Sequence, residues 1–172
     1  MKSFQVSMDH MPWVSSRTNH AKYFFGNPVL IHASLDTVWE IVKDIENYTI
    51  YSKGKITAHV DGIPEVNKTI SLALYQNKMI GNFFPVSHER ISIVDEKNKI
   101  IGWERILSGG AITERYQVLE ELKDGKTNSY IALKIPGAVG FFTNLTLKKW
   151  INEAFTEINL GIKEAAEKKL KQ

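Results

Sequence analysis

The spacing of apolar and polar residues divides the chain into four stretches. Residues 1–27 show no steady period and are interrupted by Pro12 and Gly26, so we expect an irregular N-terminal arm. Residues 28–54 begin with a short apolar run and continue at helical spacing. Residues 55–135 mostly alternate between apolar and polar, which predicts β-strands. The last stretch returns to helical spacing, which predicts a C-terminal helix.

A strand and a pair of short helices are the first expected elements. Residues 28–33, PVLIHA, form a β-branched run of strand length. Ser34 then offers an N-cap hydroxyl, and Asp36 places a negative charge in the first helical turn. We expect this helix to break at Asn47 and a second short helix to end at Gly54.

A run of antiparallel strands joined by short turns follows. The predicted strands are residues 55–60, 69–75, 87–94, 99–107, 113–122 and 127–135. Asp124-Gly125, between the last two, is a strong hairpin signal.

One long helix is expected from Thr143 to Lys169. Its apolar face consists of Leu147, Ile151, Ala154, Ile158, Gly161 and Ala165, widened by Phe155 and Ile162, and Asn159 is expected on the opposite, polar side. A glycine in a helix interior costs about 1 kcal/mol relative to alanine, so Gly161 needs a reason. Two explanations stay open at this point: close approach of the helix to the sheet, or room for a ligand.

This order of elements resembles the helix-grip fold of the START and Bet v 1-like superfamily, often called SRPBCC, including its polyketide cyclase/dehydrase-like branch. The matching segments are VLIHASLDTVWEIVKDIENYTIY, LEELKDGKTNSYIALKI and the amphipathic C-terminal helix, which together span residues 28–170. The resemblance implies an α+β fold in which a curved antiparallel sheet of about seven strands wraps around a long C-terminal helix. Two short helices between strands 1 and 2 would close one end. We therefore expect an N-terminal arm over residues 1–27 and a ligand-binding domain over residues 28–172.

The resemblance also implies a function: binding, and by extension transport, of a hydrophobic small molecule or lipid in a cavity between the sheet and the helix. We expect Trp103 and Tyr116 to face this cavity because large aromatic side chains are poorly placed on an open sheet face. Alternation then turns Arg105 and Glu114 inward as well. The expected ligand-binding residues are Trp39, Trp103, Arg105, Glu114, Tyr116, Phe142, Ala154, Ile158 and Gly161.

Two alternative functions stay open. The first is a cyclase or dehydratase in which Arg105 and Glu114 act as catalytic residues on a polyketide-like substrate. The second is a protein-interaction domain with a filled core. The sequence favours a binding protein over an enzyme because it contains no recognisable catalytic set.

The amino-acid composition argues against several other kinds of functional site and protein class. The 172 residues include no cysteine, which excludes disulfides, thiol nucleophiles and thiolate zinc sites. The histidines show no metal-ligand spacing, so neither a metal nor another cofactor is expected. The net charge is +3, and the C-terminal lysines alternate with glutamates, which is typical of a solvated helix face rather than a nucleic-acid surface. No apolar run could span a membrane or serve as a signal-peptide core, so a cytoplasmic protein is expected.

The segment IPGAVGFFTNLTLKKW connects the last strand to the long helix, and two explanations of it stay open. Its apolar residues could form a hydrophobic staple at the helix start. Alternatively, Phe141 and Phe142 could contact a membrane transiently while Lys148 and Lys149 meet anionic headgroups. The second explanation would make the segment a gate for lipid delivery.

Overall fold

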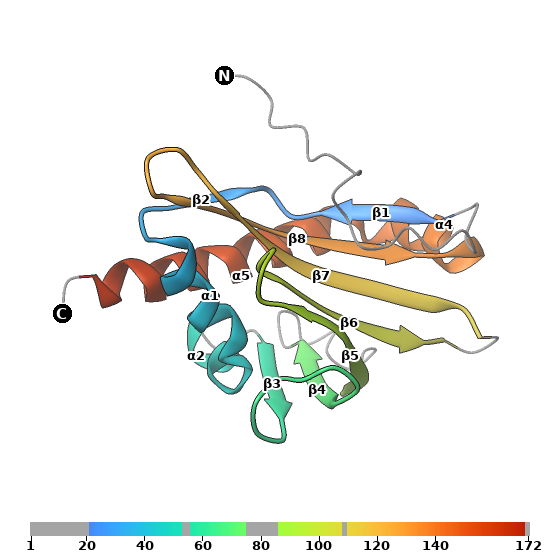
Figure 1. The fold of residues 1–172 in the computed structure, drawn as a ribbon. Coiled ribbons are helices and arrows are strands. Elements are labelled where there is room, and N and C mark those ends of the chain that lie inside the picture. The colour runs from blue at the N-terminus through green and yellow to red at the C-terminus, as the bar shows by residue number, and fades with distance from the viewer. Residues whose placement is uncertain (1–20, 53–55, 75–85, 108–109, 171–172) are drawn as a thin grey trace.

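A computed structural model of the protein describes residues 21–52, 56–74, 86–107 and 110–170 (Figure 1). These residues form an antiparallel sheet of eight strands and a long C-terminal helix, which confirms the expected α+β class. The strands are β1 (Lys22–Phe25), β2 (Val29–Ile31), β3 (Ile56–Val60), β4 (Thr69–Leu74), β5 (Ser87–Asp95), β6 (Ile100–Ile106), β7 (Ile112–Glu121) and β8 (Thr127–Ile135). The helices are α1 (Leu35–Lys43), η2 (Ile45–Asn47), α2 (Tyr48–Tyr51), α4 (Gly137–Thr146) and α5 (Lys148–Lys169).

The strand order in the sheet is β1-β8-β7-β6-β5-β4-β3, and β2 also pairs with β8. β1 and β2 therefore behave as one edge strand with an interruption. At the interruption the Gly26 amide donates to the Ile131 carbonyl at 3.0 Å. A Cβ at Gly26 would lie 2.7 Å from the Cβ of Phe155, so this glycine lets α5 pass close to the edge strand.

β1 lies within the stretch that we expected to be irregular. Lys22–Phe25 pair with Ala132–Ile135 of β8, so these four residues belong to the sheet. The sequence analysis missed this strand. Its aromatic residues YFF favour a strand, but three residues are too few to show an alternating pattern. Residues 1–20 lie outside the described residues.

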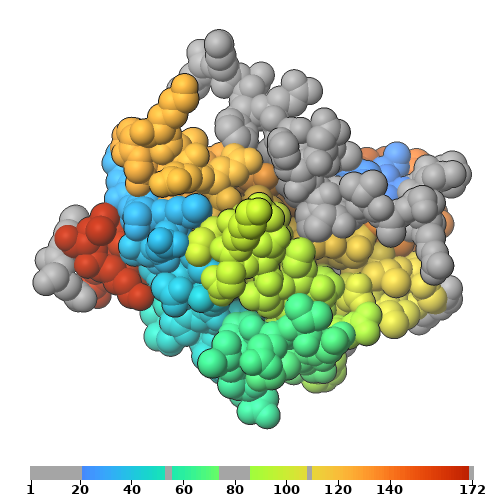
Figure 2. All heavy atoms as spheres, in the orientation of Figure 1, coloured from blue at the N-terminus to red at the C-terminus, as the bar shows by residue number. Residues whose placement is uncertain are grey.

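The first short helix begins where the sequence predicted but ends at Lys43, before the predicted break at Asn47. The predicted end of the second helix at Gly54 lies outside the described residues. The Ser34 Oγ accepts a hydrogen bond from the Thr37 amide at 3.3 Å, which confirms Ser34 as the N-cap of α1. The Tyr48 hydroxyl donates to the Val42 carbonyl at 2.8 Å and ties α2 back to the end of α1. In Figure 2 the blue atoms of this segment lie between the red end of α5 and the green atoms of β3 and β4.

The C-terminal helix begins later than predicted. We expected one helix from Thr143, but α4 ends at Thr146 and α5 starts at Lys148. The break is at Leu147, whose φ of −120° and ψ of −3° depart from helical geometry. α4 packs against β1 and β8 through Gly140, where a Cβ would lie 2.2 Å from the Ile135 carbonyl oxygen. α5 contacts β1 and β8 as well, and also reaches β2, α1 and α2.

Candidate ligand-binding cleft

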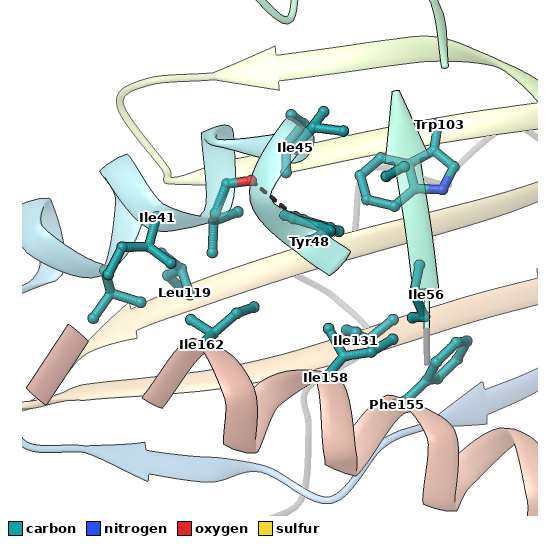
Figure 3. Close-up of a cluster of buried hydrophobic side chains, with 14 of the residues drawn as sticks. Ile41, Ile45, Tyr48, Ile56, Trp103, Leu119, Ile131, Phe155, Ile158 and Ile162 are labelled. Atoms are coloured by element: carbon teal, nitrogen blue, oxygen red, sulfur yellow. Dashed lines mark hydrogen bonds between the residues drawn. The ribbon is translucent and has the colours of Figure 1, made fainter. Parts of the chain in front are cut away.

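The space between the sheet and α5 is packed at one end, which we call the filled half. Ile41, Ile45, Tyr48, Leu119 and Ile162 meet there and are each at most 5% exposed (Figure 3). They come from α1, η2, α2, β7 and α5, so the helix pair closes this end of the molecule. Burial in an apolar environment raises the pKa of Tyr48, and its hydroxyl stays neutral.

The other end, which we call the open half, contains a cleft of about 240 Å³. Val139 and Thr143 of α4 line it, and α4 lies at the opposite end of the sheet from α1 and α2 (Figure 1). The described lining residues are Glu89, Trp103, Arg105, Leu107, Thr113, Arg115, Leu133, Ile135, Val139, Thr143, Leu147, Trp150, Ile151, Ala154, Phe155 and Ile158. Most are apolar, and the three charged members all come from the strands.

A second, much smaller space of about 10 Å³ continues from the cleft toward the filled half. Trp103, Arg115 and Ile158 line both spaces, so they mark where the two meet. Figure 3 shows Trp103 above Ile158 and Phe155, with Ile56 between them and Tyr48 to one side. We call this junction the deep end of the cleft.

The deep end holds a charged side chain in an unusual setting. The Arg115 guanidinium stacks on the Trp103 ring at 4.7 Å from the centroid, and its Nη2 lies 3.7 Å from a Glu89 carboxylate oxygen. Stacking of this kind is a favourable cation–π contact. Within the described part of the chain, the Arg115 Nε and the Trp103 Nε1 are buried and have no hydrogen-bond partner.

A polar network lies beside the deep end. The Gln117 amide nitrogen donates to Ser129 Oγ at 2.7 Å and to Asn159 Oδ1 at 2.9 Å, and Ser129 donates to the same Asn159 oxygen. All three side chains are buried. Asn159 was expected on the solvated side of the helix, and that expectation was wrong because the sheet offers it two partners.

The predicted inward orientation of Tyr116 and Glu114 was wrong. Trp103 lies opposite Arg115 in the β6–β7 register, and Gly102 lies opposite Tyr116. Directly opposed residues of an antiparallel pair share a face, so Trp103 and Tyr116 lie on opposite faces. Arg115 points toward α5 in place of Glu114. Tyr116 instead packs across Gly102, where a Cβ would lie 2.5 Å from the tyrosine ring.

The outer face of the sheet, which faces away from α5, carries its own buried cluster. It consists of Ile100, Tyr116, Val118, Tyr130 and Ala132, with Tyr23, Phe25 and Ile93 packed against it. On the same face Lys134 is 2% exposed and its ammonium lies 2.6 Å from the Glu114 carboxylate. Glu114 is therefore a partner of Lys134 and lies on the opposite face of the sheet from Arg105. The catalytic pair that we considered does not form.

The remaining predicted residues divide between the cleft and other places. Trp103, Arg105, Ala154 and Ile158 line the cleft. Trp39 is a buried residue of α1 and donates from Nε1 to Glu96 at 2.5 Å. Phe142 is 64% exposed on α4. Gly161 contacts the end of α2, since a Cβ there would lie 1.7 Å from the Tyr51 carbonyl oxygen. Close packing is therefore the reason for this glycine.

The residues that line the cleft but were not predicted to bind a ligand include Arg115, Glu89, Trp150 and Phe155. The signal that could have identified Arg115 is Gly102. A glycine in a strand has no side chain, so an aromatic residue on the neighbouring strand can pack over it. Such a neighbour would have placed Tyr116 beside Gly102 and Arg115 beside Trp103.

No described helix has the length and apolarity needed to cross a membrane. In the same part of the chain, no three His, Cys, Asp or Glu side chains gather in a way that could hold a metal ion.

Comparison with known proteins finds similarity in structure alone. No family profile matches the chain, and no curated protein matches it. Among solved structures, TTHA0849 from Thermus thermophilus aligns with a TM-score of 0.64 and 13% identity, over 86% of this chain and 98% of that one.

Two enzymes are similar to the same degree. The Zhui aromatase/cyclase from Streptomyces sp. R1128 gives a TM-score of 0.62 at 14% identity, over 88% of this chain and 96% of that one. A norcoclaurine synthase point mutant from Thalictrum flavum gives 0.63 at 12%, over 87% and 96%. Identities this low show the fold and leave the chemistry open. The chain shares the fold of these three proteins, and the sheet with its long C-terminal helix agrees with the architecture that the order of elements predicted.

Proposed function

We propose that the protein binds a hydrophobic small molecule or lipid in the cleft between the sheet and α5. The observation that supports this most is the cleft of about 240 Å³ with its largely apolar walls. Water that enters an apolar space is displaced favourably by an apolar ligand, so occupancy by such a ligand would be favourable.

The structural neighbours support this proposal by analogy of fold. One of them, the norcoclaurine synthase mutant, is described in complex with a transition-state analogue, so a protein with this fold can bind a small molecule. The cleft also argues against the interaction-domain alternative, which required a core filled throughout.

The experiment has two readouts. Organic extraction of the purified protein followed by mass spectrometry should recover an apolar molecule that co-purifies. Titration with the neutral fluorophore N-phenyl-1-naphthylamine should give saturable binding at one site. A protein that yields no extractable molecule and binds no neutral probe would refute the proposal.

α4 is the candidate entrance to the cleft. Val139 and Thr143 line the cleft from this helix, while Phe141, Phe142 and Leu145 are at least half exposed. The exposed lysines Lys148 and Lys149 follow directly. Exposed aromatic side chains beside lysines favour the surface of an anionic membrane. The proposed route of loading is therefore from a membrane, past α4 and into the cleft.

Vesicle binding tests this route against a matched surface. Ile63 and Val66, in the turn between β3 and β4, are also exposed, but Asp61 and Glu65 flank them. The double variant Phe141→Ser, Phe142→Ser should lose sedimentation with phosphatidylcholine–phosphatidylserine vesicles. The control Ile63→Ser, Val66→Ser should keep it. Equal sedimentation of both variants would exclude α4 as the membrane contact.

A further inference from the structure

We infer that the deep end of the cleft anchors a carboxylate, so that the ligand is an amphipathic acid with its acidic head beside Arg115 and its apolar tail toward α4. This inference rests on the proposed function and specifies the class of ligand. It uses Arg115 and Trp103, which no part of the proposed apolar binding requires.

The charge balance of the cleft favours an anion. The described lining includes one acidic side chain, Glu89, and two arginines, Arg105 and Arg115. Arg105 is exposed at the rim, where it donates to Ser87 at 3.3 Å. Arg115 is only 12% exposed, so its charge is largely removed from water. A carboxylate would bring the charge of this lining to zero.

Glu89 by itself leaves Arg115 incompletely paired. The contact of 3.7 Å between Nη2 and the Glu89 oxygen is longer than a direct hydrogen bond. Glu89 also accepts a hydrogen bond from Ser87 at 2.8 Å, which orients its carboxylate partly toward that hydroxyl. The Arg115 Nε remains a buried donor without an acceptor.

Trp103, on whose ring Arg115 stacks, supplies a second buried donor. Trp103 is 4% exposed, and its Nε1 has no partner within the described residues. Buried donors are nearly always paired in native proteins, so two unpaired donors on stacked side chains indicate a missing acceptor. A carboxylate has two oxygens that accept hydrogen bonds and suits both a guanidinium and an indole N–H.

The shape of the site orients the ligand. The space beyond Trp103 and Arg115 measures about 10 Å³, which is roughly enough for one water-sized group. The larger apolar space lies on the other side, along Leu133, Ile151 and Phe155. The head therefore belongs at the deep end and the tail in the open half.

Matched probes test the inference. Decanoic acid and decan-1-ol share one chain length and differ in the charge of the head, and each can compete with N-phenyl-1-naphthylamine. We expect the acid to bind at least about tenfold more tightly at neutral pH and low salt, because a charge-assisted hydrogen bond replaces a neutral one. Arg115→Gln should remove this preference and change the affinity for the alcohol less than about twofold. Arg90→Gln, an exposed arginine paired with Glu104, is the control and should leave both affinities unchanged.

A second measurement uses the unaltered protein, in case Arg115→Gln does not fold. NMR of decanoic acid labelled with carbon-13 at the carboxyl group reports its pKa in the bound state. A carboxyl beside Arg115 should titrate below the free acid, whereas one merely buried in apolar surroundings should titrate above it.

Each outcome decides a different question. Equal affinity for acid and alcohol, or a bound carboxyl whose pKa is raised, would overturn the carboxylate anchor and leave the proposed binding function intact. Failure of both compounds and of the neutral fluorophore to bind would overturn the proposed function, and the anchor with it. A preference for the acid that survives in a folded Arg115→Gln variant would exclude Arg115 as the anchor.

Discussion

The two halves of α5 carry small residues for opposite reasons. Ala154 and Gly161 are seven residues apart and so lie on the same face of the helix. At Gly161 the backbone of α2 approaches so closely that even a methyl group would collide with the Tyr51 carbonyl. At Ala154 the helix faces the cleft. On the same face of α5, Gly161 therefore allows close packing in the filled half, and Ala154 leaves space in the open half.

A small residue on a helix face can therefore indicate either close packing against another element or space for a ligand. The helix pair α1–α2 determines which of the two occurs, because it packs against one end of α5 and is absent from the other end. Substitutions that add volume at the two positions should separate folding from binding.

The largest expected effect is on folding, at Gly161. Gly161→Ala should lower the free energy of unfolding by about 3 kcal/mol, because overpacking against backbone outweighs the gain in helix propensity. Chemical denaturation would measure this. Leu160→Ala, at the neighbouring half-exposed position, should change stability by less than about 1 kcal/mol. A Gly161→Ala protein as stable as the original would mean that α2 does not restrain the helix here.

The next effect is on binding, at Ala154. Ala154→Leu should fill part of the cleft and weaken binding of N-phenyl-1-naphthylamine by at least about tenfold, or 1.4 kcal/mol, while the protein stays folded. Fluorescence titration and a thermal melt would measure the two properties. Ala138→Leu adds the same side chain at an exposed position outside the cleft and should leave the affinity unchanged. Unaltered binding by Ala154→Leu would indicate that the ligand does not bind against α5.

A smaller effect is expected within the filled half, at Tyr48. Tyr48→Phe removes the buried hydrogen bond to the Val42 carbonyl and should cost about 1 kcal/mol in unfolding free energy. Probe affinity should stay within about twofold, since the hydroxyl turns away from the cleft toward α1. A tenfold loss of probe affinity would show that the boundary between the halves lies elsewhere.

The smallest effect is a pH dependence at the edge of the filled half. His59 lies 3.0 Å from a Glu46 carboxylate oxygen, and this hydrogen bond raises the pKa of His59 above its ordinary value of 6.5. A raised pKa in the folded state contributes stability that is complete below pH 6.5 and is lost as the pH rises through the folded value. The difference in melting temperature between the original protein and His59→Gln should therefore shrink above pH 6.5.

Glu46 provides the comparison for this pair. It also accepts a hydrogen bond from the Val60 amide at 2.6 Å, which is the main reason that its pKa is lowered. Glu46→Gln should remove the pH dependence attributed to His59 and lower the melting temperature at every pH above the Glu46 pKa. A pH dependence that persists in Glu46→Gln would point to another titrating group.

The sequence by itself determined the order and the type of most elements. Ser34 caps the first helix, Asp124-Gly125 turns the last hairpin, and the alternating stretches became strands within a few residues of their predicted ends. These features depend on contacts between residues close together in the chain, and such contacts leave a pattern in the sequence.

Only the tertiary structure decided which side chains face the cleft. Tyr116, Gln117, Val118 and Leu119 are all buried, because β7 is covered on both faces. Alternation assigns such residues to two faces but cannot say which face is the inner one. The cross-strand pairing of Gly102 with Tyr116, the break at Leu147 and the approach of α2 to Gly161 all join distant segments or change their direction. They follow from packing in three dimensions, and the spacing of residues along one strand or helix carries no record of them.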